Sequence, residues 1–289
     1  MTTSKIFNRT ISVFAAFLVL LCSMTLYAGD TDAANTTRSY RVFNSRTGTE
    51  LSSYTLNALS SLNTKEVIGT DDRELDWSKN GVVKLMSTKK YLGSAFVVDA
   101  HTIATAAHCV YNVEEQLPKI ITQILLFDST GNISMYATAM ETHIPSTYIY
   151  GYGTNKYNPN YDYALITVQQ DFSEYCCFDL GVPLDSIKNS TATIKLTGFS
   201  GDLGNSPTTH NNFTSTGNIL DLTSTRLIYS CDTAGGNSGC PVYIEENRCG
   251  RQYNTAIAIH TNGNSSGNKG VRITTDLIHF YYNNPNLNY

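Results

Sequence analysis

Three short stretches of the sequence place residues able to do acid–base or nucleophilic chemistry beside strand-like segments. His108 follows the apolar run IATAA at 103–107, and Asp162 precedes the apolar run YALI at 163–166. Ser238 lies in the glycine-rich stretch GGNSGC at 235–240, ahead of another strand-like segment. Taken singly, each residue also fits an ordinary structural role. His108 could be a buried, hydrogen-bonded histidine, Asp162 a turn residue, and Ser238 part of a glycine-rich hairpin loop.

Together these residue types make a serine that can act as a nucleophile near neutral pH. A serine hydroxyl attacks poorly unless a histidine takes its proton and a buried acid orients that histidine. Backbone N–H groups must also point at the oxyanion that forms. The glycines before Ser238 allow the N–H groups of Gly236 and Ser238 to do this. The G-x-S-x-G elbow of the α/β-hydrolases does not fit, because Gly239 follows the serine directly.

The segments that must position these residues are short β-type runs. Beyond Val67 such runs recur between turn residues, the first at 82–86 and the last at 270–273. Many short strands at this spacing predict an all-β barrel or sandwich. One helical segment, Thr275 to Tyr282, follows the strands. Residues 29–66 are rich in Thr, Ser and Asn without convincing periodicity, and we interpret them as a linker or propeptide.

The composition argues against several classes of partner. Charged residues make up 15% of the 289 residues, and the formal net charge is −4. Residues 67–289 hold 14 Lys and Arg against 20 Asp and Glu without a basic cluster, so nucleic acid is not an expected partner. The sequence lacks a D-x-D-x-D-G calcium loop and the C-x-x-C spacing of zinc sites. We therefore predict no metal site and no cofactor.

The amino terminus has the form of a secretory signal. Lys5 and Arg9 precede an apolar run that continues to Ala28. Signal peptidase cuts after small residues, so the candidate cleavage positions are Ala28 and Ala33-Ala34. An uncleaved membrane anchor is the alternative. We expect residues 1–28 to be a signal peptide and the mature protein to be secreted, extracellular and away from the membrane.

Secretion leaves six cysteines in an oxidising compartment, where disulfides are expected. Cys240 and Cys249 form a plausible pair across a turn at 245–247, and the adjacent Cys176 and Cys177 are expected to bond to different partners. These cysteines are read as structural, not catalytic. The six are Cys109, Cys176, Cys177, Cys231, Cys240 and Cys249.

The three stretches resemble the chymotrypsin-like serine proteases in residue type and in the order histidine, aspartate, serine. The matching motifs are TAAHC at 105–109, DYALI at 162–166 and GNSGCP at 236–241. A closer resemblance is to the secreted bacterial glutamyl endopeptidases, and it spans residue 67 to about residue 280. It is carried by VIGTDDR at 67–73, GFSGD at 198–202, TGNI at 216–219, DT at 232–233 and AIHTNG at 258–263.

The resemblance implies two six-stranded antiparallel β-barrels with a short C-terminal helix and a site in the cleft between them. Residues 67–180 would form the first barrel, with His108 and Asp162, and residues 181–289 the second, with Ser238. Gly236 and Ser238 would supply the oxyanion hole.

The resemblance also implies a pocket for a glutamate carboxylate. Thr233, His260 and the α-amino group of Val67 would hold that carboxylate. Residues 29–66 would then be a propeptide cut after Glu66, which makes the chain a zymogen that a mature copy can process. No cysteine lies between Val67 and His108, so Cys109 must pair elsewhere, for instance with Cys176 or Cys177, or stay a free buried thiol.

The expected function is thus a secreted serine endopeptidase that cleaves after Glu, with Asp left open, through an acyl-enzyme intermediate. Its partners would be proteins or peptides with acidic residues at the cleavage site, and the enzyme would be a monomer. One alternative is a trypsin-like endopeptidase, because Asp232 stands where such enzymes keep the acid that selects Lys or Arg. The other is a catalytically silent relative that binds a host or matrix protein.

Overall fold

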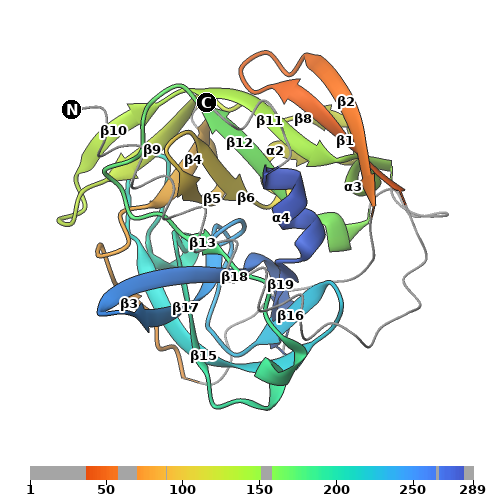
Figure 1. Cartoon of the computed structure of the whole chain (residues 1–289). Coiled ribbons are helices and arrows are strands. Elements are labelled where there is room, and N and C mark those ends of the chain that lie inside the picture. The colour runs from red at the N-terminus through yellow and green to blue at the C-terminus, as the bar shows by residue number, and fades with distance from the viewer. Residues whose placement is uncertain (1–36, 58–69, 89, 151–157, 265–266, 283–289) are drawn as a thin grey trace, which may run out of the picture. The chain divides into compact units, whose positions relative to one another are not determined.

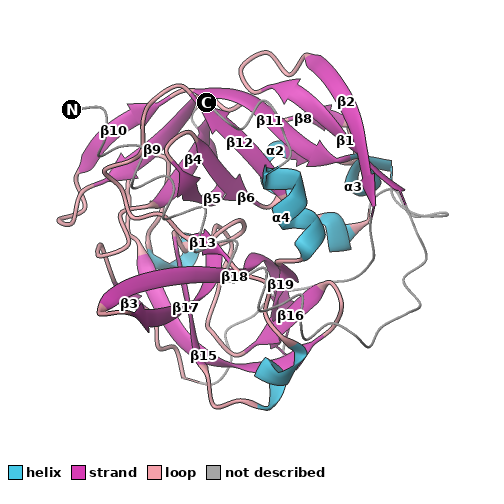
Figure 2. Cartoon of the chain, in the orientation of Figure 1, coloured by secondary structure: helices cyan, strands magenta, loops and turns pink. Residues whose placement is uncertain are grey.

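The structure is a computed structural model that describes residues 37–57, 70–88, 90–150, 158–264 and 267–282. Strands dominate it, and the helices are few and short (Figure 2). The expected signal peptide and the expected cleavage site between Glu66 and Val67 lie outside the described residues. Within the described ranges, no helix has the length and apolar character needed to cross a membrane.

The first sheet has nine strands in the order β10-β9-β4-β5-β6-β12-β11-β1-β2 (Figure 1). Only Thr138 separates β10, which pairs with β9, from β11, which pairs with β12. The nearly continuous segment β10–β11 therefore pairs near both ends of the strand order. The sheet must curl round for this to happen, as a barrel does. The strands are β1 (Thr37–Asn44), β2 (Glu50–Asn57), β4 (Val82–Ser87), β5 (Lys90–Asp99), β6 (Thr102–Thr105), β9 (Gln123–Phe127), β10 (Ile133–Ala137), β11 (Ala139–Pro145) and β12 (Ala164–Val168).

The second sheet runs β13-β18-β17-β14-β15-β16-β19, and an additional pairing of β18 with β19 closes six of its strands into a barrel. The short strand β3 joins this sheet by pairing with β15. The predicted all-β fold is confirmed. The strands are β3 (Glu74–Leu75), β13 (Asp179–Leu180), β14 (Thr193–Gly198), β15 (Phe213–Leu222), β16 (Arg226–Tyr229), β17 (Pro241–Arg248), β18 (Arg251–Asn264) and β19 (Gly267–Arg272).

The C-terminal helix α4 (Thr275–Tyr282) has the predicted bounds and packs against residues of the first sheet. The ring of Phe280 stacks on Tyr40 with centroids 4.3 Å apart, and the hydroxyl of Tyr281 donates to Asp99. The remaining elements are β7 (Tyr111–Asn112), β8 (Leu117–Pro118), α2 (Ala107–Val110), α3 (Ser146–Tyr150) and the 3-10 turns η1 (Pro159–Tyr161), η2 (Asp185–Asn189) and η3 (Gly201–Leu203).

Residues 37–57 form the hairpin β1–β2, although the sequence pattern did not predict strands there. Strand β1 pairs antiparallel with β11, from Tyr40 opposite Pro145 to Asn44 opposite Glu141. A register shift between Val42 and Phe43 marks an irregularity in its pairing with β2. Consecutive buried residues at that irregularity break the alternation that identifies a strand in a sequence.

The hairpin of β17 and β18 is longer than predicted, which corrects the expected turn at 245–247. Glu246 pairs with Tyr253 inside the ladder, and the chain turns at Cys249 and Gly250, whose φ angles are +53° and +77°. Two successive positive φ values are typical of a two-residue hairpin turn.

The same geometry corrects the predicted disulfide between Cys240 and Cys249. The two residues flank β17, so eight extended residues at about 3.3 Å each hold them roughly 26 Å apart. The six cysteines in the described part of the chain form no disulfide, so the disulfides expected of Cys176 and Cys177 are likewise absent from it. Cys109 is a free buried thiol, which was one of its two expected states.

Candidate active site

His108 and Asp162 are brought together because the strands that precede and follow them are neighbours. Strand β6 leads into α2, which carries His108, and Asp162 comes between η1 and β12. Strands β6 and β12 pair antiparallel, with Thr105 opposite Ala164. The end of one strand therefore lies beside the start of the other, although the histidine and the aspartate are 54 positions apart in the chain.

Two hydrogen bonds hold His108 on the Asp162 carboxylate. The Nδ1 atom of His108 lies 2.7 Å from Oδ2, and the backbone N–H of His108 donates to Oδ1 at 2.9 Å. Asp162 is buried, whereas 35% of the His108 side chain is exposed. An imidazole held in this way keeps its Nδ1 proton on the aspartate and leaves Nε2 to exchange a proton with a substrate or a nucleophile.

The electrostatics of the pair favour a charged imidazole. Burial lowers the pKa of His108, but the charge and hydrogen bond of Asp162, together with Cys109, outweigh it, and the net pKa is raised. Burial likewise raises the pKa of Asp162, yet the charge and hydrogen bonds of His108, together with the charge of Arg226, lower it overall. The site therefore stabilises the imidazolium that forms when His108 accepts a proton.

Ser238 lies beside the histidine segment through contacts of its backbone. Its carbonyl oxygen accepts hydrogen bonds from the N–H of Ser94 at 2.8 Å and from the thiol of Cys109 at 3.4 Å. Gly93 permits this approach, because a Cβ there would stand 2.5 Å from the Cys109 sulfur and 2.9 Å from that same oxygen. The serine loop, which precedes β17 of the second sheet, is thus joined to the residue next to His108.

The loop before Ser238 is held by donors from elsewhere in the chain. The carbonyl oxygen of Gly236 lies 2.6 Å from the hydroxyl of Tyr91 and 2.9 Å from that of Ser94. The side-chain oxygen of Asn237 accepts from the N–H of Ala234 at 3.0 Å and from the hydroxyl of Ser200. Tyr91 was not identified from the sequence, where a tyrosine in a strand carries no signal of this contact.

Gly236 has a backbone conformation that suits a donor to a ligand. Its φ is +103°, and a Cβ there would stand 2.5 Å from the carbonyl oxygen of Phe199. Only glycine accommodates both the angle and the contact. Within the described residues no protein group accepts a hydrogen bond from the Gly236 N–H, which leaves that donor available to a substrate oxygen.

Thr233 and His260, the predicted pocket residues, are both buried in the second barrel. The hydroxyl of Tyr229 bonds to Nδ1 of His260, and the Thr233 hydroxyl donates to the side-chain oxygen of Asn268 at 2.8 Å. These partners orient the histidine and the threonine, and the sequence analysis identified neither Tyr229 nor Asn268. Val67, the third predicted pocket group, lies outside the described residues.

A buried cation stands close to these residues. Arg226 is 2% exposed, and its guanidinium donates to the hydroxyl of Thr261 at 2.7 Å, next to His260 in the chain. Its charge also reaches Asp162, whose pKa it helps to lower. The interior around His260 therefore carries the positive charge of Arg226.

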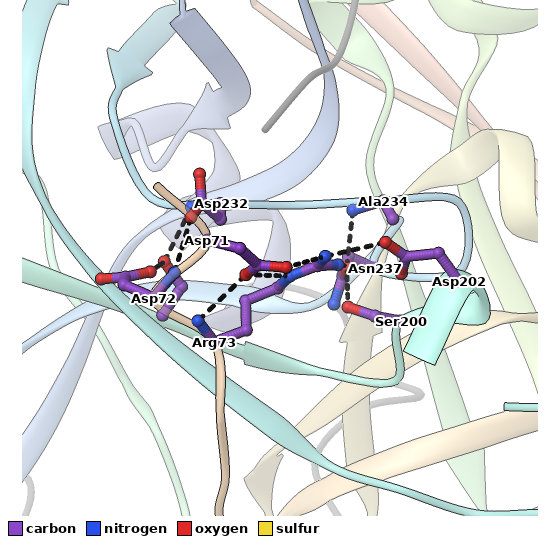
Figure 3. A network of polar contacts seen from close by, with 9 residues as sticks. Asp71, Asp72, Arg73, Ser200, Asp202, Asp232, Ala234 and Asn237 are labelled. Atoms are coloured by element: carbon purple, nitrogen blue, oxygen red, sulfur yellow. Dashed lines mark hydrogen bonds and ion pairs between the residues drawn. The ribbon is translucent and has the colours of Figure 1, made fainter. Parts of the chain in front are cut away.

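Asp232 faces the segment that follows Val67 (Figure 3). Its carboxylate accepts the backbone N–H of Asp72 at 2.9 Å. The hydroxyl of Ser215 accepts the N–H of Asp232 at 2.7 Å and donates to the Asp72 carboxylate. Asp232 and Asp72 are thus joined directly and through Ser215.

Arg73 ties the same segment to η3. Its guanidinium bonds the two carboxylate oxygens of Asp202 at 2.8 and 2.7 Å and those of Asp71 at 2.8 and 2.6 Å. The Arg73 side chain is only 3% exposed, although the two acids are about half-exposed. The N–H of Gly201 in η3 donates in turn to the carbonyl of Gly235 at 2.6 Å, so the segment 71–73 is connected to the serine loop.

Paired β-structures that bring a histidine–aspartate pair beside a glycine-rich serine loop define a serine peptidase of the trypsin-like class. The family model described as "Trypsin-like peptidase domain" matches residues 93–249. The chain belongs to this family, and it is a serine endopeptidase.

Two curated relatives match most of the chain. The chain is 30% identical over 241 residues to "Extracellular metalloprotease" of Bacillus subtilis (strain 168), covering 76% of this chain and 70% of that protein. It is 28% identical over 236 residues to "Glutamyl endopeptidase" of Bacillus licheniformis, covering 74% of this chain and 67% of that protein. In the described part of this chain, no group of three or more His, Cys, Asp and Glu side chains is placed to hold a metal ion.

A solved structure shows the same fold. The match is to "Structure of Glu endopeptidase in complex with MPD", with a TM-score of 0.59 and 23% identity, over 74% of this chain and 96% of that one. The resemblance to the chymotrypsin-like glutamyl endopeptidases is therefore confirmed as a statement of family and fold.

Proposed function

We propose that this chain is an extracellular endopeptidase that cleaves proteins after glutamate with the triad His108, Asp162 and Ser238. The observation that carries the proposal is the 2.7 Å contact of His108 with a buried Asp162, next to a residue whose thiol bonds the Ser238 backbone. The trypsin-like family and the relative named as a glutamyl endopeptidase support it.

In the proposed reaction His108 acts first as base and then as acid. Its Nε2 takes the proton of the Ser238 hydroxyl as the oxygen attacks the scissile carbonyl, and the N–H groups of Gly236 and Ser238 bind the oxyanion. The imidazolium gives this proton to the leaving amine, and an acyl-enzyme remains. A water molecule then repeats the sequence, its proton passing through His108 to Ser238 as the acid product leaves.

The proposed selectivity rests on the groups around His260. A carboxylate in a pocket needs hydrogen-bond donors or positive charge. The His260 imidazole and the α-amino group of Val67 would supply them, as would the Thr233 hydroxyl by turning its proton from Asn268 to the substrate. The buried charge of Arg226 adds to the field. Asp232, the acid of the trypsin-like alternative, already accepts the N–H of Asp72. This contact favours acidic over basic substrate residues.

The proposal includes maturation from a zymogen. Val67 has a free α-amino group only after cleavage behind Glu66, so residues 29–66 would be a propeptide and the pocket would be incomplete before the cut. Residues 1–28 would serve as the signal peptide. Because Glu66 is itself a glutamate, a mature copy of the enzyme could make this cut.

Peptides that differ only before the scissile bond test the activity. We expect the mature protein starting at Val67 to cleave after Glu, with lower kcat/KM for Asp and little for Gln, Lys or Leu, and Ser238→Ala to be inactive. Cleavage after Lys would assign the pocket to Asp232. Cleavage of none of the peptides would favour the silent binding protein.

A pair of variants tests the pocket separately from the triad. His260→Leu should lower the ratio of kcat/KM for Glu over Gln, because a hydrogen bond to the charged substrate carboxylate is worth about 1.5–3 kcal/mol. Thr255→Val, on the same strand but directed to Arg248 and Glu246, is the matched control and should keep the ratio. An unchanged ratio in His260→Leu would remove His260 from the pocket.

A further inference from the structure

The hairpin β1–β2 lies in the segment that the proposed maturation separates from the enzyme, yet it is built into the first sheet. We propose that this hairpin, residues 37–57, stays bound after cleavage as a non-covalent subunit of the mature enzyme. The partner is thus a segment of this chain. It docks on the edge of β11 that faces away from β12, together with the aromatic residues beside that edge. The inference rests on the proposed maturation at Glu66.

Main-chain pairing is the first part of the docking surface. Strand β1 adds to β11 over five residue pairs, from Tyr40 with Pro145 to Asn44 with Glu141. Beyond the strand, the N–H of Ser45 donates to Met140 at 2.9 Å, and its carbonyl accepts the N–H of Ile121 at 3.0 Å. Strand addition of this kind gives a peptide affinity through the backbone.

Side chains of the hairpin fill the apolar part of the surface. Tyr40, Val42 and Phe43 are at most 3% exposed. The Tyr40 ring stacks on Phe280 of α4 with an interplanar angle of 11°, and its hydroxyl lies 2.9 Å from that of Tyr163. These are contacts of a packed interior, not of a loosely attached leader.

Two further contacts fix the end of β1. Phe43 lies against Tyr111, with ring centroids 6.0 Å apart, and the hydroxyls of Ser45 and Thr142 are 2.7 Å apart. Tyr111, Thr142, Tyr163 and Phe280 all belong to the body of the mature enzyme.

Loss of the hairpin would uncover both kinds of surface at once. The N–H and C=O groups of β11 would become an unpaired strand edge, which invites association with other chains. The rings of Tyr111 and Phe280 would lose the rings packed against them, and the Tyr163 hydroxyl would lose Tyr40 as a partner. Exposed strand edges beside apolar patches are avoided in soluble proteins. The cleaved chain is therefore more stable with the hairpin bound.

The hairpin also bears on the candidate triad. Tyr163, which bonds Tyr40, follows Asp162 directly in the chain. Retention of the hairpin therefore supports the turn that places Asp162 against His108, and its loss should reduce activity as well as stability.

The test uses a cut that does not depend on this enzyme's specificity. The recognition sequence of an unrelated site-specific protease replaces residues 58–66 in full-length Ser238→Ala protein, which cannot process itself. After cleavage in native buffer, size-exclusion chromatography and mass spectrometry follow the two pieces. We expect them to co-elute at one to one and to separate in urea. Separate elution of the fragment would overturn the proposal. This outcome does not depend on the substrate specificity of the enzyme.

Matched substitutions in the hairpin make the test specific. Tyr40→Ala removes the stacking and the hydroxyl contact and should weaken retention of the fragment at least tenfold in dissociation constant. Leu51→Ala, at a position of the same hairpin that is 50% exposed, should leave retention unchanged. Tyr40→Phe keeps the ring and loses only the hydroxyl contact, so it should weaken retention less than Tyr40→Ala does. It replaces Tyr40→Ala in the test if that variant fails to fold. Equal retention in the Tyr40 and Leu51 variants would contradict the proposed surface.

Discussion

The hydroxyl of Tyr91 lies 2.6 Å from the carbonyl oxygen of Gly236, across 145 residues of chain. Tyr91 belongs to β5 of the first sheet, and Gly236 to the serine loop that precedes β17 of the second. The hydroxyl of Ser94, three residues further along β5, lies 2.9 Å from the same carbonyl oxygen. One strand of the first sheet thus sets the orientation of the proposed oxyanion loop.

Tyr91→Phe should therefore impair turnover more than substrate binding. Loss of one hydrogen bond is worth about 1 kcal/mol, or roughly a fivefold to tenfold fall in kcat, because the loop would spend less time in its productive orientation. KM should change little. Steady-state kinetics on a glutamyl peptide measure this.

Tyr243→Phe is the matched control for Tyr91→Phe. The Tyr243 side chain is fully buried, whereas that of Tyr91 is half-buried, and the Tyr243 hydroxyl bonds Thr197 at 3.0 Å instead of the serine loop. It should lower stability without lowering kcat. Equal kcat in Tyr91→Phe and the wild type would show that Ser94 alone suffices to hold the loop.

Asp162→Asn should lower kcat by about four orders of magnitude, the usual cost of losing the acid of such a triad. It should also shift the pH profile. Catalysis needs neutral His108, and the Asp162 charge raises the pKa of that histidine. Without the charge the pKa falls, so the acidic limb of kcat/KM against pH should move to lower pH. A limb that stays in place or moves upward would contradict the pairing.

Arg73→Gln should destabilise the fold by about 1–2 kcal/mol, because a nearly buried guanidinium bonded to two carboxylates is lost. Arg73 lowers the pKa of Asp71. This contribution should therefore be complete above about pH 4 and diminish as the pH falls through the lowered pKa. Urea unfolding at several pH values measures the difference.

Arg46→Gln serves as the control for Arg73→Gln, since Arg46 is exposed in the turn after β1. It should alter the free energy of unfolding by less than about 0.5 kcal/mol. A similar small effect of Arg73→Gln would mean that its two ion pairs are screened by solvent.

Lys84 offers a test of burial through pH. Its side chain is enclosed, with Nζ 2.8 Å from the carbonyl of Ser206 and 2.9 Å from that of Thr209, and burial lowers its pKa to about 8. Between that pH and about 10.4 the unfolded chain keeps a proton that the folded one has released. The free energy of unfolding of the wild type relative to Lys84→Met should therefore rise over this interval. A flat difference between the two proteins would contradict the lowered pKa.

The candidate chemistry was readable from short stretches of sequence. His108, Asp162 and Ser238 each stand next to an apolar or glycine-rich run, and such runs report local structure because burial sets their residue types. For the same reason the bounds of α4 and the position of β12, with its five buried residues, follow from the sequence.

Other features depended on partners that are distant in the chain. Strand β1 has a broken alternation at Val42 and Phe43, and the pairing with β11 makes it a strand. The β17–β18 ladder continues through polar residues such as Glu246, whose hydrophilic character predicted a turn. That extension also separates Cys240 from Cys249.

Residue type and periodicity are local properties, so the sequence identifies the chemical groups of the site and the regularly patterned strands such as β12. Tertiary structure alone decided which of these groups meet. Asp232 accepts the N–H of Asp72 from 160 residues away, and Tyr91 reaches Gly236. Such contacts join segments that are distant in the chain, and no local pattern records them because each partner is an ordinary residue of its own strand or loop.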